Sequence, residues 1–314
     1  MKRWPHYVTR ACAVGLVAGS LALAIHFASA QRSVTATVAA GGSDGGSAVL
    51  LSPEQQAITD AVAAGTYWRV DGPRGPIHVW RPAGYHADGA ATFLYCHGYY
   101  VDADTAWLKY QLPEQFAMSG ANALFIVPEV PNGSRQPIQY PDLIEILQLV
   151  ERTTGLPRGA GPVIAMGHSG AYRTLVAWMD APLLDTIIAF DAMYGSNDDF
   201  QAWYEGAPNR RLITVADDTL PWTEEIALDV GDTYSVDMLP TSYDRWPAGA
   251  LAARHLYIRA QYGHMSLVTG GRAIPLLLRL LPVETLATEP WQVPLGSLPP
   301  PPVLGSGSGS ASKP

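Results

Sequence analysis

Cysteine is almost absent from this chain of 314 residues, which contains only Cys12 and Cys96. Cys12 lies in an apolar segment near the amino end, and once that segment is removed Cys96 has no cysteine with which to pair. A chain without an internal disulfide must be held together by burial of apolar side chains. Apolar residues make up 48% of the sequence and charged residues 15%, so we expect a large core with Cys96 as a small buried residue in it.

Basic residues are also scarce, with 20 Lys and Arg against 28 Asp and Glu. Three of them lie in residues 1–30, and without that segment 17 basic residues oppose 28 acidic ones. Such an acidic protein repels polyanions, so nucleic acids and anionic lipid surfaces are not expected partners. The sequence also lacks metal-ligand spacings such as H-E-x-x-H, phosphate-binding loops and dinucleotide fingerprints, so we expect no metal and no cofactor.

The two ends of the chain differ in composition from its middle. Residues 1–30 have a basic start, an apolar run and the small residues Ala28-Ser29-Ala30, which predicts a signal peptide cleaved after Ala30. An uncleaved membrane anchor is the alternative, because the run is nearly long enough to span a bilayer. Gly and Ser in residues 31–51 predict a flexible linker, and the Pro/Gly/Ser-rich residues 291–314 predict a disordered tail. We therefore expect a secreted or periplasmic protein, not inserted in the membrane after cleavage, with one folded unit at residues 52–290.

Within that unit, apolar runs of five to seven residues alternate with helix-like segments. The first two runs are separated by a Gly/Pro turn, which predicts an antiparallel hairpin. Continuous apolar runs separated by helices are typical of parallel strands buried on both faces. We therefore predict an α/β fold with a mostly parallel eight-stranded sheet and helices on both faces. The eight runs are TYWRVDG, PIHVWRP, ATFLYC, NALFIVP, PVIAM, DTIIAF, RLITVA and RHLYIRA.

Function in such sheets lies at the carboxyl ends of the strands. Reactive side chains follow five of the runs there, namely His97, Ser169, Asp191, Asp217 with Asp218, and His264. Ser169 lies in Gly167-His168-Ser169-Gly170-Ala171, one residue away from the G-x-S-x-G pattern of a nucleophilic serine.

Ser43 is a rival nucleophile, because Gly41-Gly42-Ser43-Asp44-Gly45 fits the strict pattern better. Its setting excludes it, since no strand precedes it and no helix follows it. Ser169 follows the run PVIAM and precedes the helix-like GAYRTLVAWM. A serine at such a strand-to-helix turn is held clear of the sheet, and the amino end of the helix directs N–H groups toward a developing oxyanion.

The motifs HGY, GHSGA and YGHM and the chain order serine, acid, histidine resemble the α/β-hydrolase superfamily of serine esterases, lipases and some peptidases. The resemblance covers the whole folded unit at the level of strand order. It departs from the family pattern at Ala171, which replaces a glycine but is still small. The resemblance implies that Ser169 is the nucleophile, His264 its base, and the N–H groups of Gly170 and Tyr99 the oxyanion hole.

The identity of the triad acid is left open by the sequence. Asp191 lies alone between an apolar run and small residues, where a charge is costly unless an imidazole pairs with it. Asp218 follows the seventh run, which is the commoner position in the superfamily, although it also suits a turn or helix cap. We favour Asp191, keep Asp218 as the alternative, and rank Glu129 third.

These features predict a secreted serine hydrolase that cleaves an ester, or second an amide, through an acyl-enzyme. The alternative from another class is a non-catalytic binding or scaffold protein on the same fold. Residues 219–254 are longer than one crossing helix requires and carry several aromatic residues, so we expect a helix and a specificity segment there. The sequence specifies neither the acyl and leaving groups nor the oligomeric state.

Overall fold

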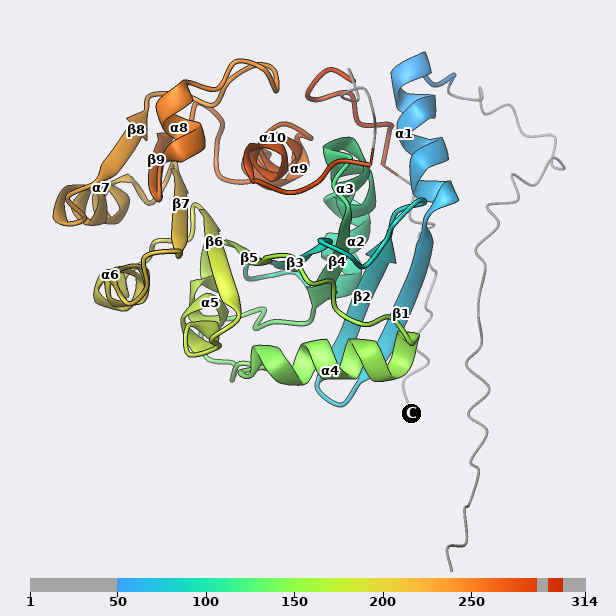
Figure 1. Cartoon of the computed structure of the whole chain (residues 1–314), viewed down its shortest axis with the longest axis horizontal. Helices are drawn as coiled ribbons and strands as arrows, with labels where there is room; N and C mark the ends of the chain where they lie inside the picture. Colours follow the sequence, from blue (N-terminus) through green and yellow to red (C-terminus); the bar gives the residue numbers. More distant parts are fainter. Residues whose placement is uncertain (1–49, 287–292, 302–314) are drawn as a thin grey trace, which may run out of the picture. The chain divides into compact units, whose positions relative to one another are not determined.

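The computed structural model describes residues 50–286 and 293–301, and its centre is a nine-stranded sheet (Figure 1). The strands lie in the order β1-β2-β4-β3-β5-β6-β7-β9-β8. β1 and β2 form the predicted antiparallel hairpin, β2 is also antiparallel to β4, and all other neighbours are parallel. The strands are β1 Thr66–Gly72, β2 Gly75–Arg81, β3 Ala91–Cys96, β4 Ala123–Pro128, β5 Val163–His168, β6 Leu184–Phe190, β7 Arg211–Ala216, β8 Thr233–Val236 and β9 His255–Arg259.

Helices cover both faces of this sheet, as predicted (Figure 1). Phe93 and Tyr95 of β3 join an apolar cluster with α2, α3, α8, α9 and α10, whereas Leu94 and Cys96 join a second cluster with α4, α5, α6 and α7. The alternation along one strand places the two clusters on opposite faces. The helices are α1 Pro53–Ala64, α2 Ala103–Lys109, α3 Leu112–Ser119, α4 Leu143–Thr154, α5 Tyr172–Trp178, α6 Asn197–Glu205, α7 Leu220–Asp229, α8 Ala248–Ala252, α9 Ser266–Thr269 and α10 Ala273–Leu280.

The prediction of eight strands is wrong, because it missed the edge strand β8. β8 lies within residues 219–254 and pairs in parallel with β9. It has four residues, none of them buried, so no apolar run marks it in the sequence. A short edge strand of this kind is common at the margin of a sheet. The same segment also contains α7 and α8.

The sequence predicts a disordered tail at residues 291–314, but residues 293–301 contact the folded unit. Val293 is buried in a small cluster with Ile58 of α1 and Met118 of α3. The amide of Gln111 donates a hydrogen bond of 2.8 Å to the carbonyl oxygen of Pro299. Apolar side chains in a proline-rich stretch thus attach residues 293–301 to the domain.

Several sequence predictions fall on parts of the chain for which the structure gives no description. The signal peptide of residues 1–30, nearly all of the linker and the tail beyond residue 301 lie outside the described residues. Within the described ranges, no helix combines the length and apolar character needed to cross a membrane.

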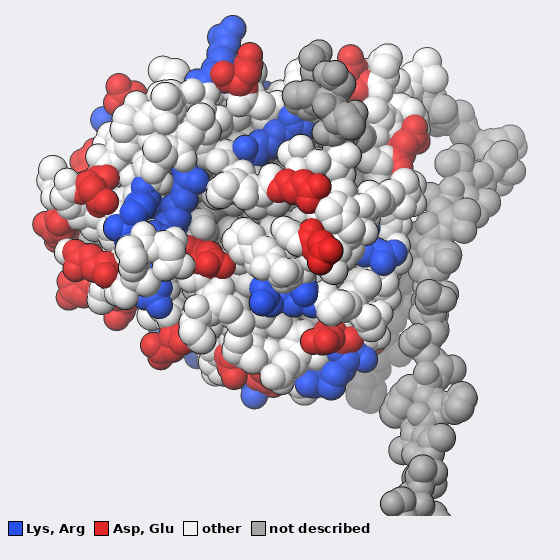
Figure 2. Space-filling view, in the orientation of Figure 1, with Lys and Arg blue, Asp and Glu red and all other residues white. Residues whose placement is uncertain are grey.

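Charged side chains of both signs are spread over the face seen in Figure 2. Acidic side chains gather at its left edge, where α6 and α7 lie. Asp198 and Asp199 belong to α6, and Glu224 and Glu225 belong to α7. The acidic balance of the sequence is therefore reflected in the surface at this edge of the sheet.

The sheet order brings the candidate residues together. β3, β5, β6, β7 and β9 are consecutive neighbours and parallel, so the loops after them emerge side by side. These loops carry His97, Ser169, Asp191, Asp218 and His264. The carboxyl ends of these strands therefore hold the favoured nucleophile and base and both leading candidates for the acid.

Candidate active site

Ser169 stands at a sharp turn between β5 and a short 3-10 segment, Ser169–Ala171, that leads into α5. Its φ of 53° lies in the left-handed region, which costs a residue with a side chain about 1–3 kcal/mol. A Cβ atom on Gly167 would lie 2.7 Å from Leu175 Cδ1 and 3.3 Å from the Cβ of Ala171. The turn therefore requires small residues two positions before and two positions after the serine, where Gly167 and Ala171 stand.

The loop after β3 packs against this turn. A Cβ atom on Gly98 would approach the Cβ of Ser169 to 3.0 Å, so the two backbones are close because Gly98 has no side chain. A Cβ atom on Gly170 would lie 2.4 Å from the Tyr99 ring. Tyr99 and Gly170, the residues predicted to supply the oxyanion hole, are thus in direct contact, and their role as N–H donors stays a prediction.

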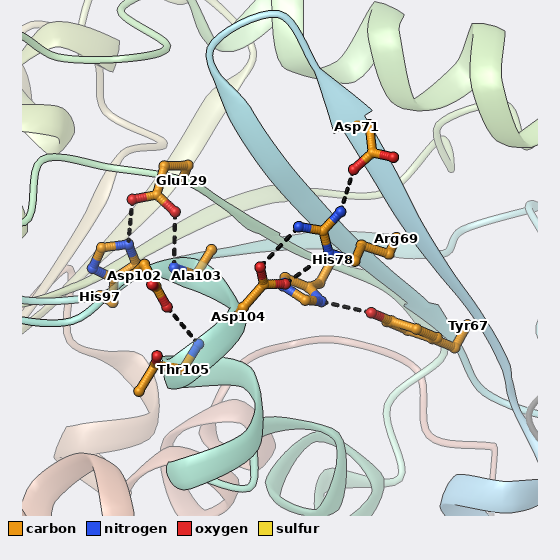
Figure 3. Close-up of polar contacts among 10 residues, drawn as sticks. All are labelled: Tyr67, Arg69, Asp71, His78, His97, Asp102, Ala103, Asp104, Thr105 and Glu129. Carbon is orange, nitrogen blue, oxygen red and sulfur yellow. Dashed lines mark hydrogen bonds and ion pairs between the residues drawn. The ribbon is translucent and has the colours of Figure 1, made fainter. Parts of the chain in front are cut away.

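Buried polar groups hold the loop after β3 in place (Figure 3). His97 donates from Nδ1 to the carbonyl oxygen of Gly98 at 2.8 Å and accepts at Nε2 from the N–H of Val130 at 3.4 Å. Burial lowers the pKa of His97 to about 4, so its ring is neutral and can do both. Glu129, the third candidate acid, accepts from the N–H of Ala103 at 2.9 Å and lies 3.8 Å from His97. It therefore belongs to this loop and not to His264.

A second group of contacts fixes α2, which follows the same loop (Figure 3). Arg69 on β1 donates two hydrogen bonds, of 2.7 and 2.8 Å, to the carboxylate of Asp104. That carboxylate also lies 3.0 Å from Nε2 of His78, whose Nδ1 is 2.8 Å from the hydroxyl of Tyr67. The hairpin and the start of α2 are thereby joined, which limits movement of the loop between β3 and α2.

Asp191 is completely buried and meets the imidazole of His264. Its Oδ2 lies 2.5 Å from Nδ1 of His264. The same carboxylate accepts from the backbone N–H groups of Asp217, Asp218 and Thr219 at 3.0, 3.1 and 2.8 Å, and from the Thr219 hydroxyl at 2.7 Å. A buried charge is tolerated when it is hydrogen-bonded in this way. The structure therefore brings together the favoured acid and the favoured base.

The pKa values of the pair shift in opposite directions. Burial by itself would raise the pKa of the Asp191 carboxyl, but the hydrogen bonds from His264, the Asp217 N–H and Thr219 outweigh it and hold the pKa well below its ordinary range. The hydrogen bond to Asp191 raises the pKa of His264 above its ordinary value of 6.5, although partial burial opposes this. At neutral pH Asp191 is therefore a carboxylate able to orient His264.

Asp218, the alternative acid, is placed less favourably. Its carboxylate lies 3.8 Å from Nδ1 of His264, and its side chain is 62% exposed. Asp191, Asp218 and His264 each offer a ligand atom within 4.8 Å of the others, as a metal site would require. Nδ1 of His264 and Asp191 already bind each other, so we interpret these three residues as an acid–histidine pair with a neighbouring aspartate and not as a metal site.

Two further side chains of the site were not assigned catalytic roles from the sequence. His168 is buried, and its Nε2 donates to the carbonyl oxygen of His264 at 3.2 Å. Burial, and then the charge of His264, lower the pKa of His168 to about 3, so it is a neutral support for the base. Tyr194, three residues after Asp191, packs its ring edge-on to that of His264, with centroids 6.5 Å apart, and lies near the side chain of Ser169. The sequence signal for Tyr194 is only its place in the loop after β6.

The side chain of Ser169 lies near Tyr194 in this structure. Among the hydrogen bonds of the described residues, none joins the Ser169 side chain to His264 or to Tyr194. The base is nevertheless near, because its ring centroid lies 4.4 Å from that of His168, the residue before the serine. Catalytic hydrogen bonds between a serine and its base often form fully only when substrate is present.

With His264 as the predicted base, its raised pKa predicts how activity depends on pH. A protonated imidazole cannot accept the serine proton, so kcat/KM should rise with pH through the pKa of His264, with a midpoint above 6.5. Removing the carboxylate in Asp191→Asn removes the main cause of the shift and should move this midpoint down. Rates of ester hydrolysis between about pH 5 and 9 measure both midpoints. A midpoint that stays the same in the variant would contradict the assignment.

Comparison with known proteins gives matches in structure but not in sequence. No family model and no curated protein sequence matches the chain. The feruloyl esterase module of Clostridium thermocellum is similar at 12% identity, covering 76% of this chain and 93% of its own, with a TM-score of 0.47. The fluorophosphonate-binding serine hydrolase FphF of Staphylococcus aureus is similar at 13% identity over 64% and 92%, with a TM-score of 0.42. A hormone-sensitive lipase from a metagenome library matches at 14% over 73% and 90%, with a TM-score of 0.43.

The fold itself is assigned from the chain's own architecture. Its sheet is parallel beyond an antiparallel start, a strained serine turn follows β5, and an acid and a histidine follow β6 and β9. Serine, acid and histidine occur in this order along the chain, as in the family that the sequence motifs resemble. The chain therefore has the α/β-hydrolase fold.

Proposed function

We propose that this protein is a secreted or periplasmic serine hydrolase that cleaves carboxylic esters through an acyl-enzyme. The observation that carries the proposal is the buried carboxylate of Asp191, 2.5 Å from Nδ1 of His264, at the sheet edge where Ser169 stands on a strained turn. A fully buried carboxylate with four other hydrogen bonds is a costly arrangement unless it orients a base. Amides are the second candidate substrates.

In the first half of the reaction, Ser169 attacks the ester carbonyl carbon. With Nδ1 of His264 bound to Asp191, Nε2 is the nitrogen left to take the serine proton. The carbonyl oxygen gains negative charge, and the N–H groups of Gly170 and Tyr99 stabilise it. When the intermediate collapses, Nε2 gives the proton to the leaving alcohol, and the acyl group remains on Ser169.

In the second half, water attacks the acyl carbon. Nε2 of His264 takes a proton from the water as the new C–O bond forms, and then returns it to the Ser169 oxygen as the acyl–serine bond breaks. Asp191 keeps its charge throughout, because its hydrogen bonds hold its pKa far below neutrality. It stabilises the imidazolium that forms in both halves.

A fluorophosphonate probe tests the proposal, because it phosphonylates a serine only when that serine is activated. We expect the wild type to be labelled, Ser169→Ala not to be labelled, and Ser43→Ala to be labelled like the wild type. Ser43 is the matched control because its pentapeptide fits the G-x-S-x-G pattern. A folded wild type that takes up no label would favour a non-catalytic binding protein and overturn the proposal.

Substrate class is measured separately from nucleophile identity. A series of p-nitrophenyl esters of rising acyl length, run beside aminoacyl amides, should show higher kcat/KM for the esters. The acyl length with the highest kcat/KM then defines the acyl preference. Faster cleavage of the amides would make the protein an amidase or peptidase with the same triad.

A further inference from the structure

Tyr194 lies beside the reacting groups, with its ring packed against two other rings. The side chain of Ser169 is close enough to act on its phenol, whose pKa it lowers against the effect of burial. Its ring stands edge-on to His264, with centroids 6.5 Å apart and planes at 74°. On another side the ring of Trp222, at the start of α7, lies 5.8 Å away at 48°. The two ring contacts therefore place the phenol beside the base, with the nucleophile close to it.

Tyr194 and the oxyanion loop approach Ser169 from opposite sides. The sheet order β3-β5-β6 places the loop with Tyr99, which follows β3, on one side of the serine turn. The loop with Tyr194 follows β6 and so lies on the other side, next to the loop of His264. In a tetrahedral intermediate on Ser169, the oxyanion points to the first side, so the hydroxyl of Tyr194 faces the remaining substituents.

The leaving-group oxygen is the substituent that the acid form of His264 must reach. Because the ring of Tyr194 packs against His264 and its phenol lies near Ser169, the space between these two residues also lies within reach of its hydroxyl. We propose, building on the hydrolase function above, that Tyr194 is a catalytic residue whose hydroxyl donates a hydrogen bond to the leaving-group oxygen of the ester. Such a hydrogen bond favours esters of ordinary alcohols, because the alkoxides of these alcohols are poor leaving groups.

The step balances without any further reactant. The bond from the acyl carbon to the leaving oxygen breaks, and its electron pair goes to that oxygen. Nε2 of His264 transfers its proton to the same oxygen, while Tyr194 keeps its own proton and only donates a hydrogen bond. Burial, followed by the charges of Asp191 and Asp218, raises the pKa of Tyr194, so the phenol remains a donor at neutral pH.

Tyr194→Phe tests the proposal with two esters of one acyl group. Ethyl butyrate has a leaving group that needs stabilisation, whereas p-nitrophenyl butyrate has one that leaves as a stable anion. Measuring kcat/KM reports acylation for both. We expect the variant to lose about ten- to a hundredfold on the ethyl ester, the range of a hydrogen bond to a charged group, and to keep nearly all its rate on the p-nitrophenyl ester.

Controls distinguish a hydrogen bond from Tyr194 to the leaving group from a purely structural role of this residue. Phe keeps the ring contacts with Trp222 and His264, and fluorophosphonate labelling together with thermal unfolding shows whether the serine turn is intact. Tyr234→Phe, on the edge strand β8, is the matched control and should leave both rates unchanged. An equal loss on the two esters, or no loss on either, would overturn the role of Tyr194 alone. A wild type inactive on both esters would overturn the proposed function and this inference with it.

Discussion

Ser169→Ala is expected to lower kcat for p-nitrophenyl butyrate by about 10⁵- to 10⁶-fold, with little change in KM. The alanine removes the atom that forms the acyl bond, whereas substrate binding and the oxyanion donors remain. His264→Ala should cost about as much, because a serine hydroxyl without a base is a poor nucleophile. The double variant should be no slower than either single variant, since the two residues act as one unit.

This comparison separates a catalytic pair from two independent contributions. Independent residues would give a double variant whose loss is the product of the single losses. That outcome, or a Ser169→Ala variant that keeps more than about a hundredth of the wild-type rate, would contradict the assigned mechanism. Thermal unfolding of each variant shows whether a loss reflects the chemistry or the fold.

Much of the fold could be predicted because most residues of the central strands are apolar. All six residues of β3, β4 and β5 are buried, and short apolar runs separated by helix-like segments are typical of strands covered on both faces. β8 gives no such signal, since its side chains are exposed or half-buried. Composition also misled at residues 293–301, where a few apolar contacts outweigh a proline-rich sequence.

The sequence predicts those site residues that directly follow a recognisable strand. Ser169 and His264 follow strands that the apolar runs reveal, and the choice of Asp191 follows from the cost of an unpaired buried charge. The sequence does not reveal how the loops after the strands are oriented. The three N–H groups of residues 217–219 turn toward Asp191, and this determines which aspartate is buried beside His264. Tyr194 and His168 were missed as contacts for the same reason.

Asp191→Asn is expected to lower kcat by about 10⁴-fold. The asparagine carbonyl, in the place of Oδ1, can still accept from the N–H groups of Asp217 and Thr219. Its NH₂ group then takes the place of Oδ2 and faces Nδ1 of His264, and the N–H of Asp218 loses its acceptor. That nitrogen must then accept a hydrogen bond, so the proton of the neutral ring moves to Nε2. An Nε2–H group cannot take the proton of Ser169, and the base is lost although the geometry is kept.

Asp218→Asn is the matched control, because Asp218 is the other aspartate within 4 Å of Nδ1 of His264. Its side chain is 62% exposed, and a water-screened charge at 3.8 Å contributes little, so the rate should fall less than about fivefold. Stopped-flow or steady-state hydrolysis of one p-nitrophenyl ester measures both variants. A large loss in Asp218→Asn with a small one in Asp191→Asn would make Asp218 the triad acid. The buried carboxylate of Asp191 would then serve to hold the loop of residues 217–219, to which it is bound by four hydrogen bonds.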